Sequence, residues 1–93
     1  MKKQKSAFII GITGQDGCYL SLYLLKKNYK IFGFTRSLSK KNLKNLEKTN
    51  IKKKINLIKY SEKNYKIIFK QLKKTNPEEI YYFAGQSSVG LSY

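Results

Sequence analysis

Three glycines, each three residues from the next, stand between an apolar run and a segment with helical spacing, in the stretch Gly11-Ile12-Thr13-Gly14-Gln15-Asp16-Gly17. Residues 7–12 are apolar and partly β-branched, as in a strand buried on both faces. At a strand–loop–helix junction the first glycine permits a tight turn, the second lets a phosphate approach the backbone, and the third lets the helix pack closely. The helix N-terminus adds unpaired N–H groups and partial positive charge, so the stretch predicts a pyrophosphate-binding loop.

The segment after the loop, residues 18–28, predicts a helix packed on a sheet, with Asn28 as a left-handed residue at its end. Its apolar surface comprises Tyr19, Leu20, Leu22, Tyr23, Leu24 and Leu25. Residues 30–36 then predict a second strand. The span from residue 7 to residue 36 has the length of one βαβ unit, which requires parallel strands.

The rest of the chain repeats this alternation. Leu43, Leu46 and Ile51 mark one side of a short helix, and residues 55–60 predict a third strand. Ser61-Glu62 offers a cap for an amphipathic helix whose apolar positions follow the i, i+3, i+4, i+7 spacing, namely Tyr65, Ile68, Phe69 and Leu72. Pro77 prevents that helix from continuing, and residues 80–84 predict a fourth strand.

This β-α-β-(α)-β-α-β pattern predicts an α/β fold, a Rossmann-type doubly wound parallel sheet with strand order 3-2-1-4. With about four strands the sheet is incomplete, so we interpret residues 1–93 as the N-terminal part of an NAD(P)-binding Rossmann domain. Ligands of such sheets bind outside the carboxyl ends of the strands, where the strand order reverses. The residues expected at that crevice are the glycine loop and the segment from Ala84 to Ser87.

The end of the second strand indicates which dinucleotide is bound. NAD sites tend to place an acidic residue there for the ribose 2′-hydroxyl, whereas NADP sites favour a cation for the 2′-phosphate. This strand ends in Thr35-Arg36-Ser37 with no acidic residue nearby. Because arginine forms bidentate, charge-assisted hydrogen bonds with phosphate, we predict NADP.

The charge of the chain is strongly positive. Lysine and arginine total 20 against 5 acidic residues, which gives a formal net charge of +15. Such an excess suits proteins that bind nucleic acid or anionic membranes. The lysines are dispersed, however, with one run at Lys52-Lys53-Lys54, and Arg36 is the sole arginine. We therefore interpret the lysines as solvated outer faces and expect no nucleic-acid partner.

Residue types that are scarce exclude several kinds of site. The chain has one cysteine, Cys18, and no histidine. A disulfide framework, a thiol metal cluster and catalysis by Ser/His or Cys/His are therefore excluded, and no metal site is expected. We expect Cys18 to be a small buried residue of the first helical turn.

Apolar residues follow the basic stretch Met1–Lys5, but the glycine loop interrupts them before they reach the length of a signal sequence. No stretch approaches the ~20 apolar residues needed to span a bilayer. We therefore expect a cytoplasmic protein without a membrane partner.

The sequence resembles the GDP-mannose 4,6-dehydratases, which belong to the extended short-chain dehydrogenase/reductase group. The most particular match is the Gln15-Asp16 pair inside the glycine loop, followed by Tyr19-Leu20. The resemblance continues through Gly33 and Arg36. It resumes in residues 76–81 and ends in residues 84–93, and residues 38–60 match least well.

The resemblance implies a set of cofactor-binding residues. Those lining the pyrophosphate would be Gly11, Ile12, Thr13, Gly14, Gln15 and Asp16. Arg36 and Ser37 would hold the 2′-phosphate, and the segment along the nicotinamide-side ribose would be Phe83, Ala84, Gly85, Gln86 and Ser87. Ser61-Glu62 stands where the family has an Asp-Leu pair beside the adenine, and Ser61 is the poorer acceptor.

The resemblance also implies a reaction for the whole enzyme, in which NADP takes a hydride from C4 of GDP-mannose, water leaves across C5–C6, and the hydride returns to C6. The product would be GDP-4-keto-6-deoxymannose, and family members are homo-oligomers. The family's Thr/Ser-x-Glu element and Tyr-x-x-x-Lys pair lie well downstream, so no catalytic residue is assigned within these 93 residues. Tyr23 and Lys27 have the latter spacing but fall on the first helix. We expect a cofactor-binding fragment that is inactive alone.

Two alternatives remain at this stage. One keeps the fold and makes the chain part of another NAD(P)-dependent sugar-nucleotide epimerase or reductase. The other, of a different class, is a small basic nucleic-acid-binding protein, whose affinity would fall steeply with salt.

Overall fold

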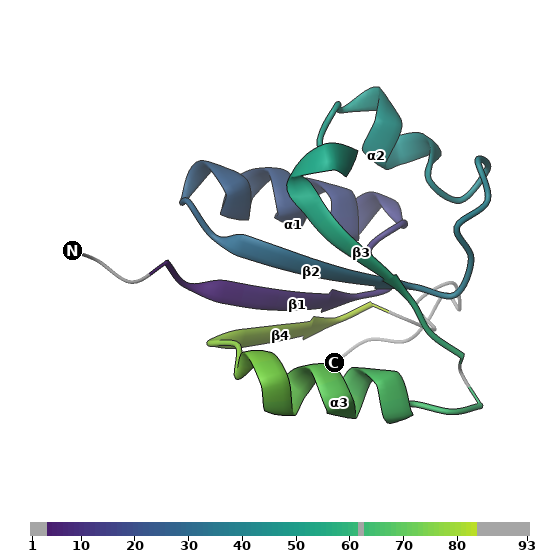
Figure 1. Ribbon diagram of the computed structural model, residues 1–93. Helices are drawn as coiled ribbons and strands as arrows, with labels where there is room; N and C mark the ends of the chain where they lie inside the picture. The colour runs from purple at the N-terminus through teal and green to yellow at the C-terminus, as the bar shows by residue number, and fades with distance from the viewer. Residues whose placement is uncertain (1–3, 62, 84–93) are drawn as a thin grey trace, which may run out of the picture.

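The structure is a computed structural model that describes residues 4–61 and 63–83. Strands and helices alternate as the sequence predicts (Figure 1). In chain order the elements are β1 (Ser6–Ile10), α1 (Gln15–Lys26), β2 (Lys30–Thr35), α2 (Lys44–Lys48), the 3₁₀ turn η1 (Lys52–Lys54), β3 (Ile55–Lys59), α3 (Lys66–Thr75) and β4 (Glu79–Tyr82).

All four strands are parallel and lie in the order β3-β2-β1-β4, which confirms the predicted incomplete Rossmann-like sheet. Helices α1 and α2 cover one face of this sheet and α3 covers the other (Figure 1). Strand β1 lies at the centre, with Phe8 opposite Phe32 on β2 and opposite Ile80 on β4. Among the described helices, none is long and apolar enough to cross a membrane.

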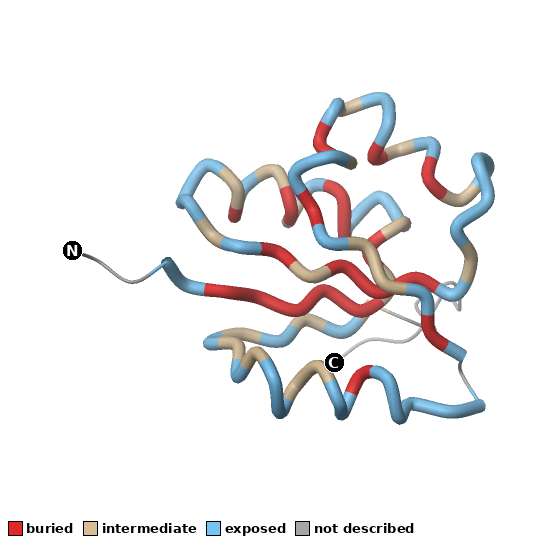
Figure 2. The backbone as a smooth tube through the Cα atoms, viewed as in Figure 1, coloured by how far each residue is buried: buried red, intermediate tan, exposed pale blue. Residues whose placement is uncertain are grey.

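The core has two parts, one on each side of the sheet. Ala7 and Ile9 contribute to the part beneath α1 and α2, whereas Phe8 and Ile10 contribute to the part beneath α3. Figure 2 shows β1 buried along its whole length. Successive side chains of a strand point to opposite faces, so helices on both faces explain why β1 is a continuous apolar run.

Helix α1 differs from the prediction at its start and on one of its faces. It begins at Gln15, three residues earlier than the apolar spacing indicated, because the glycine loop itself leads into the first turn. Tyr19 and Tyr23, which are expected on the apolar surface, point outward with exposed fractions of 60% and 55%. The predicted left-handed residue after the helix is confirmed, since Asn28 has a φ of 65°.

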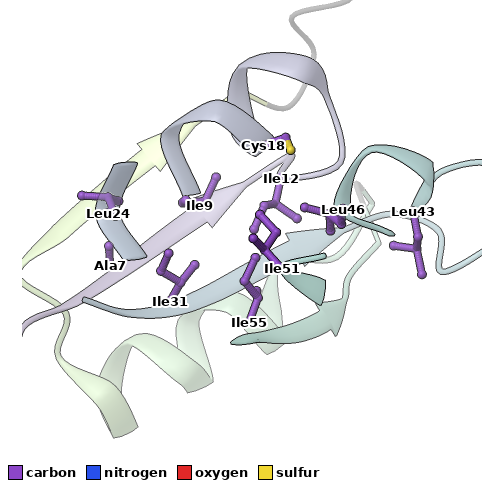
Figure 3. Packing of buried hydrophobic residues seen from close by; sticks show 10 residues of the cluster. All are labelled: Ala7, Ile9, Ile12, Cys18, Leu24, Ile31, Leu43, Leu46, Ile51 and Ile55. Carbon is purple, nitrogen blue, oxygen red and sulfur yellow. The ribbon is translucent and has the colours of Figure 1, made fainter. Parts of the chain in front are cut away.

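The short predicted helix is confirmed as α2, but only one of its three predicted apolar positions, Leu46, lies within the helix. Leu43 precedes the helix and Ile51 follows it, and all three side chains are buried. Leu46 is inaccessible to solvent, and Leu43 and Ile51 are nearly so. Figure 3 shows Leu46 and Ile51 near Ile12, on the same side of the sheet as α1, with Leu43 beyond Leu46.

Two expectations for α3 are wrong. Ser61 does not cap the helix: α3 begins at Lys66, whose N–H donates to Oδ1 of Asn64 at 3.0 Å. The expected apolar face is also only partly buried: Phe69 is 60% exposed, and Tyr65 precedes the helix and is 38% exposed. The helix contacts the sheet through Ile68 and Leu72. The predicted end is confirmed, since Asn76 adopts the left-handed conformation directly after Thr75.

Candidate cofactor-binding site

The glycine loop turns at the carboxyl end of β1 and is tied to the end of β2. Gly11 has a φ of 88°, a conformation that glycine adopts at little cost. The N–H groups of Gly11 and Ile12 both donate to the carbonyl of Phe34, at 2.8 and 3.2 Å. The two strand ends that carry the loop and Arg36 are therefore held next to each other.

The glycines have distinct steric roles. A Cβ added to Gly17 would lie 2.7 Å from the carbonyl oxygen of Ile12, so α1 crosses the loop at a distance that only glycine permits. A Cβ added to Gly14 would meet no atom closer than the Gly11 oxygen at 3.9 Å, and Gly14 is exposed. Gly17 therefore sets the packing of helix on strand, while Gly14 leaves open backbone that a ligand can approach.

The N-terminus of α1 opens onto this exposed backbone. Gly14 is the N-cap residue and makes no side-chain capping bond, and its carbonyl accepts the helical bond from Cys18 N at 3.0 Å. Gln15 and Asp16 are exposed in the first turn, and the Gln15 amide donates to the Tyr19 hydroxyl at 3.4 Å. Helix N-termini carry partial positive charge and attract phosphates, so this end of α1 can receive an anion.

The residues after β2 form a compact turn at the same edge of the sheet. The Thr35 hydroxyl donates to the carbonyl of Ser37 at 2.9 Å and accepts from Ser37 N at 3.3 Å. Ser37 Oγ in turn accepts from Ser39 N at 3.2 Å. These bonds fix the backbone around Arg36, whose side chain is exposed. A guanidinium in this position can meet a phosphate that lies beside the glycine loop.

A shallow cavity of about 410 Å³ follows the end of β3, and its lining includes Tyr60, Ser61 and Asn64. Ser61 stands at the position where the resemblance places the adenine. The Ser61 hydroxyl already accepts from Lys63 N at 3.1 Å, so it is engaged in its own turn.

Phe83 is the last described residue of the site. Its N–H donates to the carbonyl of Ile10 at 2.7 Å, so the chain leaving β4 starts directly beside the glycine loop. The remaining predicted members of this segment lie outside the described residues, namely Ala84, Gly85, Gln86 and Ser87. Among the described residues of the predicted site, those from Gly11 to Asp16 lie at the same edge of the sheet as Arg36 and Ser37.

One contact of the loop was missed by sequence reasoning. The Asn45 side-chain amide, on α2, donates to the carbonyl of Thr13 at 3.4 Å. A cavity of about 420 Å³ borders the two helices here, lined by Gln15, Cys18, Tyr19, Asn45, Lys48 and Thr49. No sequence signal pointed to Asn45, because it lies 32 residues from Thr13 in a lysine-rich segment without a motif. Cys18 is buried, as expected.

A second polar cluster, also unpredicted, lies at the opposite edge of the sheet, where the strands begin. Tyr29 and Tyr81 donate to the two carboxylate oxygens of Glu79, at 2.6 and 2.5 Å. The hydrogen bond to Glu79 raises the pKa of Tyr29 to about 12. The same bond, followed by that from Tyr81, holds the pKa of Glu79 below its usual value. The cluster lines a cavity of about 660 Å³ remote from the glycine loop.

The described residues contain no group of three His, Cys, Asp or Glu side chains able to hold a metal ion. The edge that carries the loop thus combines open glycine backbone, a helix N-terminus and an arginine. Comparison with known proteins agrees with this picture: the family model of the GDP-mannose 4,6-dehydratases matches residues 8–93. The chain belongs to this family.

Individual GDP-mannose 4,6-dehydratases are similar along the whole chain. GDP-mannose 4,6 dehydratase 1 of Arabidopsis thaliana is 33% identical over 99 residues, an alignment that covers 100% of this chain and 27% of the relative. The Drosophila melanogaster enzyme is 35% identical over 97 residues and is covered to 25%. The chain therefore corresponds to an N-terminal quarter of the dehydratases that it matches.

The fold is shared with a sugar-nucleotide enzyme outside the GDP-mannose dehydratases. The dTDP-glucose 4,6-dehydratase of Bacillus anthracis, solved in complex with NAD, superimposes with a TM-score of 0.71 at 23% identity. The match covers 89% of this chain and 27% of that protein. At this level of identity, the similarity shows that the two proteins share a fold.

Proposed function

We propose that this chain is the cofactor-binding part of a GDP-mannose 4,6-dehydratase and that it binds NADP. The observation that carries the proposal is the junction of two strand ends, where the backbone N–H groups of Gly11 and Ile12 bond to Phe34 O. This junction puts the glycine loop and the N-terminus of α1 beside the turn that presents Arg36. Pyrophosphate and 2′-phosphate are the two anionic groups of NADP, and the site offers a separate cationic or N–H-rich feature to each.

The space around the glycines of the loop supports the binding of a dinucleotide. A Cβ would clash at Gly17, where helix and loop meet, and would have room at Gly14, where a phosphate must approach. The loop from Gly11 to Asp16 would hold the pyrophosphate, and Arg36 with Ser37 would hold the 2′-phosphate. Phe83 and the following residues to Ser87 would run along the nicotinamide-side ribose.

In this role the chain binds and orients, and the chemistry of the whole enzyme is shared with other parts. When bound, NADP supplies the hydride acceptor and donor for the conversion of GDP-mannose to its 4-keto-6-deoxy product. The residues of this chain hold the dinucleotide against the carboxyl ends of β1 and β2. We assign no catalytic group within the chain.

The proposal is tested by titrating the protein with NADPH and NADH and following the fluorescence of the reduced nicotinamide. We expect NADPH to bind more tightly. Arg36→Ala should weaken NADPH binding about 10- to 100-fold, the effect of losing a charged hydrogen bond worth about 1.5–3 kcal/mol, with little change for NADH. Lys53→Ala is the matched control, because it removes one exposed positive charge from η1. Equal affinity of the wild-type chain for both dinucleotides would overturn the 2′-phosphate assignment.

A further inference from the structure

We infer that Asn45 is a positioning residue of the glycine loop: through its bond to the Thr13 carbonyl, α2 holds the loop in the conformation that receives the pyrophosphate. The inference rests on the proposed function. It assigns a role in cofactor binding to a residue that lies outside the loop and outside the turn after β2.

Helix α2, which carries Asn45, is held in place by its surroundings. A five-residue helix has no stability of its own in water, so tertiary contacts must hold α2. Leu43 and Leu46 anchor it in the hydrophobic cluster that it shares with α1 (Figure 3). The hydroxyl of Thr49 donates to the Asn45 carbonyl at 2.9 Å, and the Cys18 thiol lies 3.6 Å from the same oxygen. The backbone of Asn45 is therefore secured both within α2 and against α1.

From this fixed backbone the Asn45 side chain reaches the loop. Its Nδ2 lies 3.4 Å from the carbonyl oxygen of Thr13, and both residues are half-buried. A trans peptide unit is planar, and its N–H points opposite to its C=O. Because Asn45 directs the Thr13 carbonyl toward α2, it also directs the N–H of Gly14 away from α2.

The Gly14 N–H is the group that this orientation prepares for a ligand. Its internal acceptor is the Gly11 carbonyl, 3.5 Å away, a hydrogen bond about as long as the 3.4 Å contact between Asn45 and Thr13 and with an uncharged acceptor. A phosphate oxygen is a stronger acceptor, and no Cβ at residue 14 obstructs its approach. Asn45 thus orients the Gly14 N–H, which can exchange the Gly11 carbonyl for a phosphate oxygen. Because this N–H is already oriented, binding costs less conformational entropy.

The chain offers a matched control for this contact. Asn56, on β3, also donates from Nδ2 to a backbone carbonyl at 3.4 Å, in this case that of Ile31 on β2. Asn45→Ala and Asn56→Ala therefore remove the same type of bond, but only the first acts on the glycine loop.

The experiment measures NADPH and NADH affinity and amide hydrogen exchange of both variants and of the wild-type chain. We expect Asn45→Ala to weaken both dinucleotides by a similar factor, about three- to tenfold, because the pyrophosphate is common to them. The NADPH/NADH ratio should stay as in the wild type, whereas Arg36→Ala should reduce that ratio. The Gly14 amide should exchange faster in Asn45→Ala without ligand, and Asn56→Ala should change neither affinity nor Gly14 exchange.

The two proposals fail in different ways. Unchanged affinity and unchanged Gly14 exchange in Asn45→Ala would overturn the positioning role and leave the cofactor assignment standing. Equal losses of affinity in Asn45→Ala and Asn56→Ala would show that the Asn45 contact contributes only to the overall stability of the fold, and would also overturn its positioning role. If the wild-type protein binds neither NADPH nor NADH, the proposed function itself is refuted, and with it the role of Asn45 in binding.

Discussion

The hydroxyl of Tyr29 donates a 2.6 Å hydrogen bond to the carboxylate of Glu79, a residue 50 positions later in the chain. Tyr29 leads into β2 and Glu79 opens β4, so the bond spans the central strand β1 at the edge where the strands begin. Tyr81 donates to the other carboxylate oxygen. The carboxylate therefore ties together strands on either side of β1, at the far end of the sheet from the glycine loop.

This bond predicts a loss of stability at alkaline pH. The pKa of Tyr29 is raised to about 12 from an ordinary value of 10.0, so the folded state favours the protonated phenol. Its contribution is fully present below pH 10 and disappears as the pH rises through about 12. We expect the difference in unfolding free energy between wild type and Tyr29→Phe, measured with urea, to shrink over this range.

Subtracting the variant removes the pH effects that the two proteins share. Glu79 has a lowered pKa, so its contribution is lost instead as the pH falls below its ordinary value of 4.5. Glu79→Gln should therefore flatten the acid limb of the same profile. A wild-type-minus-Tyr29→Phe difference that is constant from pH 9 to pH 12 would contradict the role given to the bond.

The two steric roles in the glycine loop predict opposite outcomes for the same substitution. Gly17→Ala places a methyl group 2.7 Å from the Ile12 carbonyl oxygen and should destabilise the fold by about 1–3 kcal/mol, as overpacking does. Gly14→Ala adds a methyl group in open space at a φ of −74°, which alanine adopts readily. We expect it to change the unfolding free energy by less than about 1 kcal/mol. Urea denaturation of the pair measures both effects, and equal losses would show that the close approach at Gly17 has relaxed.

The end of α3 gives a third prediction. Asn76 has a φ of 51°, and its N–H bonds to the Leu72 carbonyl at 2.8 Å. Non-glycine residues without a short polar side chain lose about 1–2 kcal/mol in this left-handed region, so Asn76→Ala should lower thermal stability. Asn76→Gly should preserve it, because glycine adopts the conformation freely. Lys74→Ala, an exposed substitution inside α3, serves as the control and should leave the melting temperature within a degree or two of the wild type, as surface changes do. If Asn76→Gly lowers the melting temperature as much as Asn76→Ala does, the asparagine side chain, rather than the backbone conformation, stabilises this end of the helix.

Much of the fold follows from local sequence signals, and the errors have a common physical cause. The glycine loop, the left-handed Asn28 and the apolar run of β1 are local features, and the strand order follows from the βαβ connections. Phe69 is different: its apolar character fits the helix pattern, but how far a helix face is covered depends on what packs beside it. The outward positions of Tyr19 and Tyr23 on α1 have the same origin.

The candidate site divides in the same way. The loop from Gly11 to Asp16 and the residues Arg36 and Ser37 lie at one edge of the sheet because strand order brings them there, and strand order was predictable. In contrast, the contact of the Asn45 side chain with the Thr13 carbonyl in this site joins residues 32 positions apart. The Tyr29–Glu79 pair at the opposite edge of the sheet joins residues 50 positions apart. Such contacts depend on side-chain geometry after the elements have docked, and no spacing rule encodes them.

The central place of β1 has a consequence for synthesis on the ribosome. Among the described strands, β1 leaves the exit tunnel first, and both β2 and β4 later align on it. The bonds that close the glycine loop come from residues before α3, namely the Phe34 carbonyl on β2 and the Asn45 side chain on α2. The glycine loop can therefore take shape while α3 and β4 are still being translated, so a nascent chain can form the proposed nucleotide-binding edge before β4 joins the sheet.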